Sequence, residues 1–268
     1  MSVAGPVEGT AVSSDGIPIH YKFFDAGDWT VVFVHGWGDS MAAWDPHIAA
    51  VSPPYSVVLL DLAGHGRSGK GRKAWTIEAF ADDVRAVCDA LHVKRGVLVG
   101  HSMGGPIILE VALRIPDRIA GLVPIDIIVD VDHVRTADDR AAFFGYMRED
   151  FKGAVSSLVV SLFPPNADKA SVGRIIAMEM ANDPRMMVPA LESAMAYDVR
   201  AALSRIRVPV FAINANLSPT SIEHNRKYAP QYDAVIMNSV SHWLMLDRPD
   251  EFNANLLKGL ADIRSHTP

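Results

Sequence analysis

The pentapeptide G-H-S-M-G at residues 100–104 constrains the fold of this chain more than any other segment. It follows the apolar run 96–99 and precedes the helix-like run 106–113. In a G-x-S-x-G sequence between a strand and a helix, the serine occupies the apex of a strained turn that exposes its hydroxyl. The glycines let the two backbones approach closely. We therefore predict a strand, a tight turn and a helix, with Ser102 as a candidate nucleophile.

Short apolar runs without polar alternation recur along the chain, and helix-like segments lie between them. Such runs are typical of strands buried on both faces of a parallel sheet. Asp15-Gly16 separates two alternating runs, which predicts an antiparallel hairpin at the start. The predicted strands cover residues 9–13, 17–24, 30–34, 55–60, 96–99, 119–125, 208–213 and 234–237. The sequence thus predicts an α/β fold: a mostly parallel eight-stranded sheet with helices on both faces.

Residues 131–204 interrupt this alternation with a helix-favouring composition rich in Ala, Met and Phe. An insertion that carries its own apolar side chains is typical of a helical lid. Its Met and Phe residues either form the core of the lid or line a cleft beneath it, and we expect some to do the latter. The predicted domains are a core of residues 1–130 and 205–268 and a lid of residues 131–204.

Composition excludes several classes of protein. The chain has 268 residues, of which 49% are hydrophobic, so it can bury one large core. Its net charge is −6 and its basic residues are scattered, which argues against a nucleic-acid partner. Cys88 is the single cysteine and lies on the apolar face of a predicted helix, which favours a reducing compartment. No signal peptide or apolar run of about 18 residues occurs, so we expect a soluble, cytoplasmic protein of undetermined oligomeric state.

A nucleophilic serine needs a base and donors for an oxyanion. His242 lies in S-V-S-H-W, directly after the last predicted strand, and is the best-placed base among ten histidines. H-G-W-G at residues 35–38 follows the first buried strand, where a glycine-flanked turn can direct the backbone N–H of Trp37 towards the serine. Met103 N–H is the expected second donor, because it heads the helix after the nucleophile.

A third glycine-rich segment, D-L-A-G-H-G-R-S at residues 61–68, follows the next strand. Together with H-G-W and G-H-S-M-G-G it resembles the α/β-hydrolase superfamily, and the resemblance covers essentially the whole chain. The chain looks most similar to small serine hydrolases: esterases, cofactor-free haloperoxidases and carbon–carbon bond hydrolases. This resemblance implies a catalytic role for His242. We interpret residues 61–68 as a structural loop beside the active site.

The acidic residue that should orient His242 departs from the commoner pattern of this superfamily. Most relatives carry an aspartate after the seventh strand in a Gly-x-x-Asp arrangement, but here N-A-N-L-S-P-T places Ser218 at that point. A hydroxyl cannot stabilise an imidazolium as a carboxylate does. The next acid, Glu223, falls in the following predicted helix.

Asp126 is the favoured substitute, because it ends the strand predicted next to the nucleophile strand, and some members of the superfamily carry their acid after this strand. Asp130 and Asp132 are alternatives that lie further into the lid. Asp126 could instead be a helix cap or a turn residue.

These expectations combine into a serine hydrolase with the triad Ser102, His242 and Asp126. A composition rich in Met and Phe favours a pocket for esters of small to medium acyl groups. No metal or organic cofactor is expected, since neither an H-E-x-x-H sequence nor a cysteine pair occurs. Two alternatives remain: a carbon–carbon bond hydrolase of β-diketones or dienoates, and a slow-turnover ligand-sensing protein of the same fold.

Overall fold

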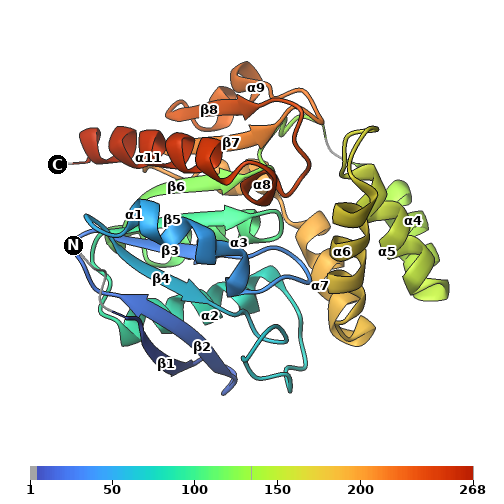
Figure 1. Ribbon diagram of the computed structural model, residues 1–268, viewed down its shortest axis with the longest axis horizontal. Coiled ribbons are helices and arrows are strands. Elements are labelled where there is room, and N and C mark those ends of the chain that lie inside the picture. Colours follow the sequence, from blue (N-terminus) through green and yellow to red (C-terminus); the bar gives the residue numbers. More distant parts are fainter. Residues whose placement is uncertain (1–4, 134, 268) are drawn as a thin grey trace.

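A single eight-stranded sheet runs through the part of the chain, residues 5–133 and 135–267, that the computed structural model describes (Figure 1). The order is β1-β2-β4-β3-β5-β6-β7-β8. β2 pairs antiparallel with β1 and β4, and the other pairs are parallel. The strands are β1 Val7–Val12, β2 Pro18–Phe24, β3 Thr30–Val34, β4 Ser56–Leu60, β5 Gly96–His101, β6 Ile119–Ile125, β7 Val210–Ala215 and β8 Tyr232–Met237. The predicted sheet is confirmed.

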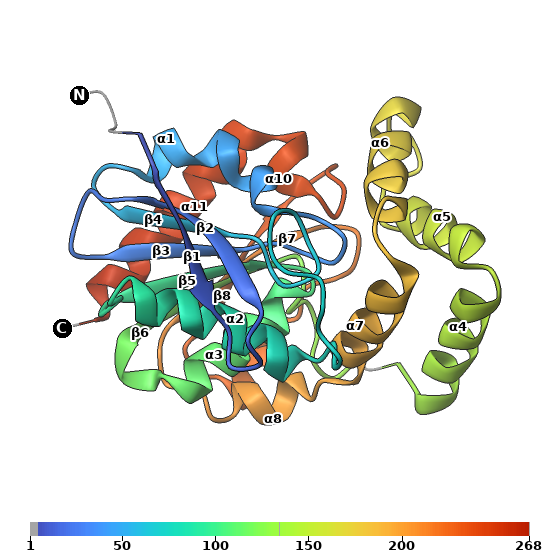
Figure 2. The same cartoon turned by 90° about the horizontal axis from the view of Figure 1, so that it is seen from below.

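The central strands are apolar throughout because both of their faces are covered. Every residue of β3, β4, β5, β6 and β7 is buried. Figure 2 shows α1 and α11 on one face of the sheet and α2, α3 and α8 on the other. The helices of the core are α1 Ile48–Val51, α2 Ile77–Ala90, α3 Gly104–Arg114, α9 Ile222–Tyr228, α10 Leu244–Asp247 and α11 Pro249–Ser265, with 3-10 turns η1 Met41–His47 and η2 Pro116–Arg118.

Individual residues account for several local features of the fold. The Thr76 side chain caps α2 by accepting the N–H of Ala79 at 3.2 Å. Pro18 is the first residue of β2, where its missing N–H costs no ladder bond. Cys88 is buried, and burial raises the pKa of its thiol to about 12. The strand predicted at 208–213 instead begins at Val210, because Pro209 cannot donate to the ladder.

Between β6 and β7 the described residues form five helices: α4 Ala137–Glu149, α5 Phe151–Ser161, α6 Lys169–Met180, α7 Pro184–Ala196 and α8 Val199–Leu203. Each begins after an Asp or Thr whose side chain accepts a backbone N–H of the first turn. α4 to α7 project beyond the carboxyl ends of the strands (Figures 1 and 2). We call α4 to α7 the helical insertion. α8 packs against α3 in the core.

The order of the strands creates a crevice beside this insertion. From β3 the chain passes to β4 on one side and then crosses to β5 on the other. Ligands of open α/β sheets bind outside the carboxyl ends of strands where the connections diverge in this way. The loops after β3 and β5 therefore frame the expected site. Among the described residues, no helix is both long enough and apolar enough to cross a membrane.

Candidate active site

Ser102 stands in the turn between β5 and α3 with a φ of 52°, in the left-handed region. Its N–H donates to the carbonyl of Ile125 at 3.1 Å, and its own carbonyl accepts the N–H of Gly105 at 2.8 Å. A Cβ on Gly100 would collide with the Gly104 carbonyl, and one on Gly104 would lie 2.6 Å from the Val34 carbonyl oxygen. The turn is thus as tight as the G-x-S-x-G motif predicts, and Ser102 lines a cavity.

His242 and Asp126 meet at the carboxyl end of the sheet. Nδ1 of His242 lies 2.6 Å from Oδ2 of Asp126, and both side chains are buried. A carboxylate only accepts, so Nδ1–H is the donor, and in the neutral ring Nε2 is the nitrogen without a proton. The other Asp126 oxygen accepts the N–H of Ala215 at 2.8 Å. His242 lines the same cavity as Ser102, so the fold brings all three predicted residues to one place.

The loop of His242 is fixed by two backbone contacts. The N–H of His242 donates to the carbonyl of Leu162, in the helical insertion, at 2.9 Å. Its carbonyl accepts from Nε2 of His101 at 2.9 Å. The residue before the nucleophile therefore orients the loop of the predicted base.

The other candidate acids lie in different environments. Asp130 contacts Nδ1 of His224 at 3.0 Å, and Asp132 accepts the hydroxyl of Tyr228 at 2.8 Å. Glu223 lies in the first turn of α9, and Ser218 is exposed. The ring of His242 makes its carboxylate contact with Asp126.

Trp37 and Met103 lie on the two loops that frame the crevice, after β3 and β5. Among the described residues neither backbone N–H has a hydrogen-bond partner. Buried backbone donors are seldom left unpaired, so these two N–H groups are candidates for binding a group that enters the crevice. The indole of Trp37 is held by the carbonyl of Met187, 2.7 Å from Nε1.

Two buried histidines hold the loop that carries Trp37. Nε2 of His65 accepts the N–H of Gly38 at 3.2 Å, and Nε2 of His35 accepts that of Leu62 at 3.0 Å. Burial lowers the pKa of His65 to about 3 and that of His35 to about 4, so both rings are neutral and able to accept. This role of His65 was not predicted, since its one signal in the sequence is its place in the D-L-A-G-H-G segment.

The cavity around Ser102 has a volume of about 170 Å³. Its lining is mostly apolar: Trp37, Leu158, Val159, Leu162, Leu191, Met195 and Trp243. The expectation of a pocket rich in Met and Phe is wrong, because side chains such as Phe144, Met147 and Met187 are buried in the core instead. Two ionisable residues, Glu179 and Arg135, also line the cavity and were not predicted.

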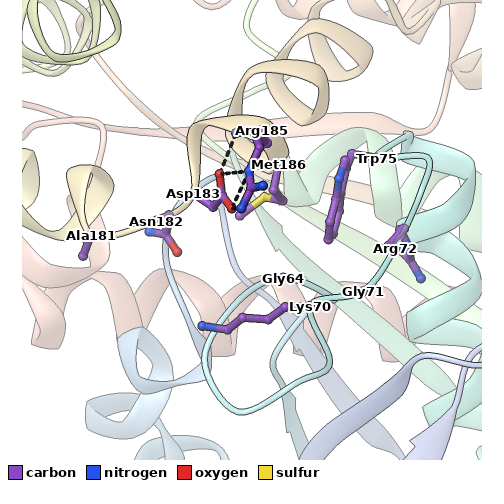
Figure 3. Close-up of a pocket in the computed structure, with 10 residues that line it drawn as sticks. All are labelled: Gly64, Lys70, Gly71, Arg72, Trp75, Ala181, Asn182, Asp183, Arg185 and Met186. Carbon is purple, nitrogen blue, oxygen red and sulfur yellow. Dashed lines mark hydrogen bonds and ion pairs between the residues drawn. The ribbon is translucent and has the colours of Figure 1, made fainter.

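A larger cavity of about 620 Å³ lies between the loop 64–75 and the connection from α6 to α7 (Figure 3). None of the predicted catalytic residues lines it. Two of its cations are already paired, Arg72 with Asp83 and Arg185 with Asp183. Its size therefore does not identify it as the catalytic site. No cluster of three metal-ligating side chains occurs among the described residues.

Comparison with known proteins identifies the family to which this fold belongs. A family model of the alpha/beta hydrolase fold matches residues 30–164. A pimeloyl-[acyl-carrier protein] methyl ester esterase of Aliivibrio salmonicida is 26% identical over 244 residues, which are 84% of this chain and 90% of that protein.

Solved structures resemble the chain over nearly its whole length. Est816, described as an N-acyl homoserine lactone degrading enzyme, has a TM-score of 0.80 at 26% identity and covers 93% of this chain and 99% of its own. The bromoperoxidase of Bacillus anthracis has a TM-score of 0.82 at 20% identity over 95% of this chain and 100% of its own, a likeness of fold alone.

Proposed function

Because the chain belongs to the alpha/beta hydrolase fold family, we propose that it is a serine hydrolase that cleaves carboxylic esters through an acyl-enzyme. The observation that carries this proposal is the 2.6 Å contact between Nδ1 of His242 and Asp126 beside the cavity of Ser102. That contact leaves Nε2 of His242 free to take the serine proton.

In the first half of the reaction Oγ of Ser102 attacks the ester carbonyl carbon while Nε2 of His242 removes its proton. The resulting oxyanion accepts hydrogen bonds from the backbone N–H groups of Trp37 and Met103. Asp126 holds the imidazole and stabilises its positive charge. His242 then protonates the leaving oxygen, which departs as an alcohol and leaves the acyl group on Ser102.

In the second half a water molecule replaces the alcohol. His242 removes a proton from this water as the water oxygen attacks the acyl carbon. The second oxyanion that results accepts hydrogen bonds from the same two N–H groups. Collapse of this intermediate breaks the bond to Oγ, and the proton on His242 returns to Ser102. The products are one carboxylic acid and one alcohol for each ester and water consumed.

The substrate class follows from the cavity. Its volume of about 170 Å³ is smaller than the roughly 300–1,000 Å³ of sites for drug-sized ligands, and its walls are mostly apolar. Both properties favour small to medium acyl groups. The helical insertion supplies Leu158, Leu191 and Met195 to these walls, so we propose that it acts as a lid. The Aliivibrio relative, named as a methyl ester esterase, supports ester hydrolysis.

Turnover of p-nitrophenyl esters from acetate to dodecanoate tests this function, with Ser102→Ala as control. The expected result is saturable hydrolysis of the shorter esters that Ser102→Ala abolishes. Hydrolysis that persists in Ser102→Ala would contradict the proposal. Cleavage of β-diketones or dienoates with no turnover of any ester would instead favour carbon–carbon bond hydrolysis. Tight ligand binding without turnover would favour a sensor.

A further inference from the structure

Glu179, near the end of α6, places a carboxyl group in the wall of the catalytic cavity. The residue is only 2% exposed, and Oε2 has no hydrogen-bond partner among the described residues. Glutamate is seldom fully buried without a partner. The carboxyl group is therefore an unused hydrogen-bonding group in a cavity whose other walls are mostly apolar.

The carboxyl group lies directly on the loop that carries Trp37. A Cβ on Gly38 would collide with Oε2 of Glu179, so the two groups are in contact. The chain directly after α6 is hydrogen-bonded to this loop as well, because Nδ2 of Asn182 donates to the carbonyl of Gly38 at 2.9 Å. Since Trp37 N–H is one of the proposed oxyanion donors, Glu179 is held close to the position of the scissile carbonyl.

Burial disfavours the charged form of Glu179, and a second buried carboxyl group nearby adds to this effect. Asp39 is 7% exposed and its Oδ2 also lacks a partner among the described residues. Burial and the nearby charge of Asp39 raise the pKa of Glu179 well above its ordinary value, and burial raises that of Asp39 to about 6. A protonated carboxyl group has one O–H donor and one carbonyl acceptor.

The surroundings narrow the chemistry of the group that Glu179 can bind. The cavity carries one carboxyl group and one guanidinium group, so a substrate carboxylate would meet Glu179 and a substrate cation would meet Arg135. An uncharged group that both donates and accepts matches the protonated carboxyl group, and a hydroxyl is the smallest such group. A site built to hydrogen-bond a hydroxyl discriminates strongly against an analogue that lacks it, because its own polar group is then left unpaired.

We propose that Glu179 is a specificity-determining residue that binds a substrate hydroxyl placed a few bonds from the scissile ester carbonyl. This inference rests on the proposed ester hydrolysis at Ser102. The hydroxyl can belong to either the acyl or the alcohol part of the ester, since both meet at the carbonyl.

Three esters show whether the hydroxyl belongs to the acyl or to the alcohol part. Ethyl butyrate has no hydroxyl, ethyl 3-hydroxybutyrate, used as each enantiomer, has one on the acyl part, and 2-hydroxyethyl butyrate has one on the alcohol part. Their kcat/KM values are measured for the parent, Glu179→Gln, Glu179→Met and a control, Glu149→Gln, which changes an exposed carboxylate on α4. Gln keeps a donor and an acceptor, whereas Met keeps only the length of the side chain.

We expect the parent to favour at least one hydroxylated ester over ethyl butyrate by about tenfold or more, as one hydrogen bond to a buried group warrants. Glu179→Gln and Glu149→Gln should keep this preference. Glu179→Met should lose it. A parent without the preference, or a preference that survives Glu179→Met, would overturn the inference.

Calorimetric titration of the same esters into Ser102→Ala and into Ser102→Ala/Glu179→Met supplies a second readout that needs no turnover. We expect the hydroxylated ester to bind about tenfold more tightly to Ser102→Ala than to the double variant, while ethyl butyrate does not distinguish them. Equal binding of the hydroxylated ester by both variants would overturn the inference. If the parent hydrolyses no ester, the proposed function fails, and this titration alone decides the role of Glu179.

Discussion

Oδ2 of Asp126 lies 2.6 Å from Nδ1 of His242, although 116 residues separate them in the chain. Asp126 directly follows β6 and has a φ of 50°, which turns its side chain back over the ends of the neighbouring strands. Its other oxygen accepts the N–H of Ala215, the last residue of β7. The carboxyl group of Asp126, which follows β6, thus lies at the end of β7. In the commoner family pattern the acid follows β7 itself.

Asp126→Asn should lower kcat/KM for a short ester at least a hundredfold, because an amide neither holds the required tautomer nor stabilises the imidazolium. Circular dichroism should show a folded protein. Asp130→Asn and Ser218→Ala serve as controls and should stay within about twofold of the parent, since neither residue contacts His242. An Asp126→Asn enzyme as active as the parent, together with an inactive Glu223→Gln, would show that the acid is wrongly assigned.

Gly38→Ala should disturb the loop that carries Trp37. Gly38 has a φ of 70°, where a Cβ costs about 1–2 kcal/mol, and the new methyl group would also press on Glu179. We expect a loss of stability of at least this size in urea unfolding and at least a tenfold fall in kcat. Gly145→Ala is the matched control: Gly145 lies in α4 with open space around its Cα, so alanine should leave activity unchanged. Unchanged kcat in Gly38→Ala would count against the loop as an oxyanion donor.

Stability should depend on pH through His65. Its pKa is about 3 in the folded protein and about 6.5 in an exposed imidazole, so below pH 6.5 the unfolded chain binds the additional proton. The stability that neutral His65 contributes is therefore present above pH 6.5 and is lost as the pH falls towards 3. Asp39 opposes this trend, because its raised pKa makes the folded state bind more protons between about pH 4 and 6.

Comparison of the parent with a His65 variant isolates the contribution of this histidine to the pH dependence of stability. In urea unfolding followed by tryptophan fluorescence, the free energy of unfolding of His65→Gln should fall less steeply than that of the parent between pH 6 and 4. The expected difference in slope is about 1.4 kcal/mol per pH unit. His266→Gln, at the exposed end of α11, should keep the slope of the parent. Equal slopes for His65→Gln and the parent would contradict the prediction.

The volume of the cavity should set the acyl-chain preference. Leu158→Phe adds bulk to a residue that lines the cavity of about 170 Å³. We expect the ratio of kcat/KM for hexanoate over acetate to fall about tenfold, since each methylene in an apolar pocket is worth roughly 10- to 200-fold. Leu257→Phe, on the exposed face of α11, should leave the ratio unchanged. A ratio unaffected by Leu158→Phe would mean that the acyl group binds elsewhere.

The sheet could be predicted because strands buried on both faces appear in the sequence as continuous apolar runs. The turn at Ser102 could be predicted because its close backbone contacts require glycine at fixed positions. The environment of Glu179 was not predictable. It lies between Met178 and Met180 in a helix, and periodicity alone does not tell which side of an insertion helix meets the core. Its carboxyl group contacts Gly38, which lies in a loop that is distant in sequence. The hydrogen bond from Gly38 to His65 is a long-range contact of the same kind.

The central claim, that Ser102 is a nucleophile activated by His242 and Asp126, is tested most directly by covalent labelling with a fluorophosphonate. Intact-mass and peptide analysis of the parent should show one phosphonyl group per chain, attached to Ser102. Labelling should be at least a hundredfold slower in Asp126→Asn and absent in Ser102→Ala. No adduct on the parent, or an adduct that forms equally on Ser102→Ala, would contradict the account.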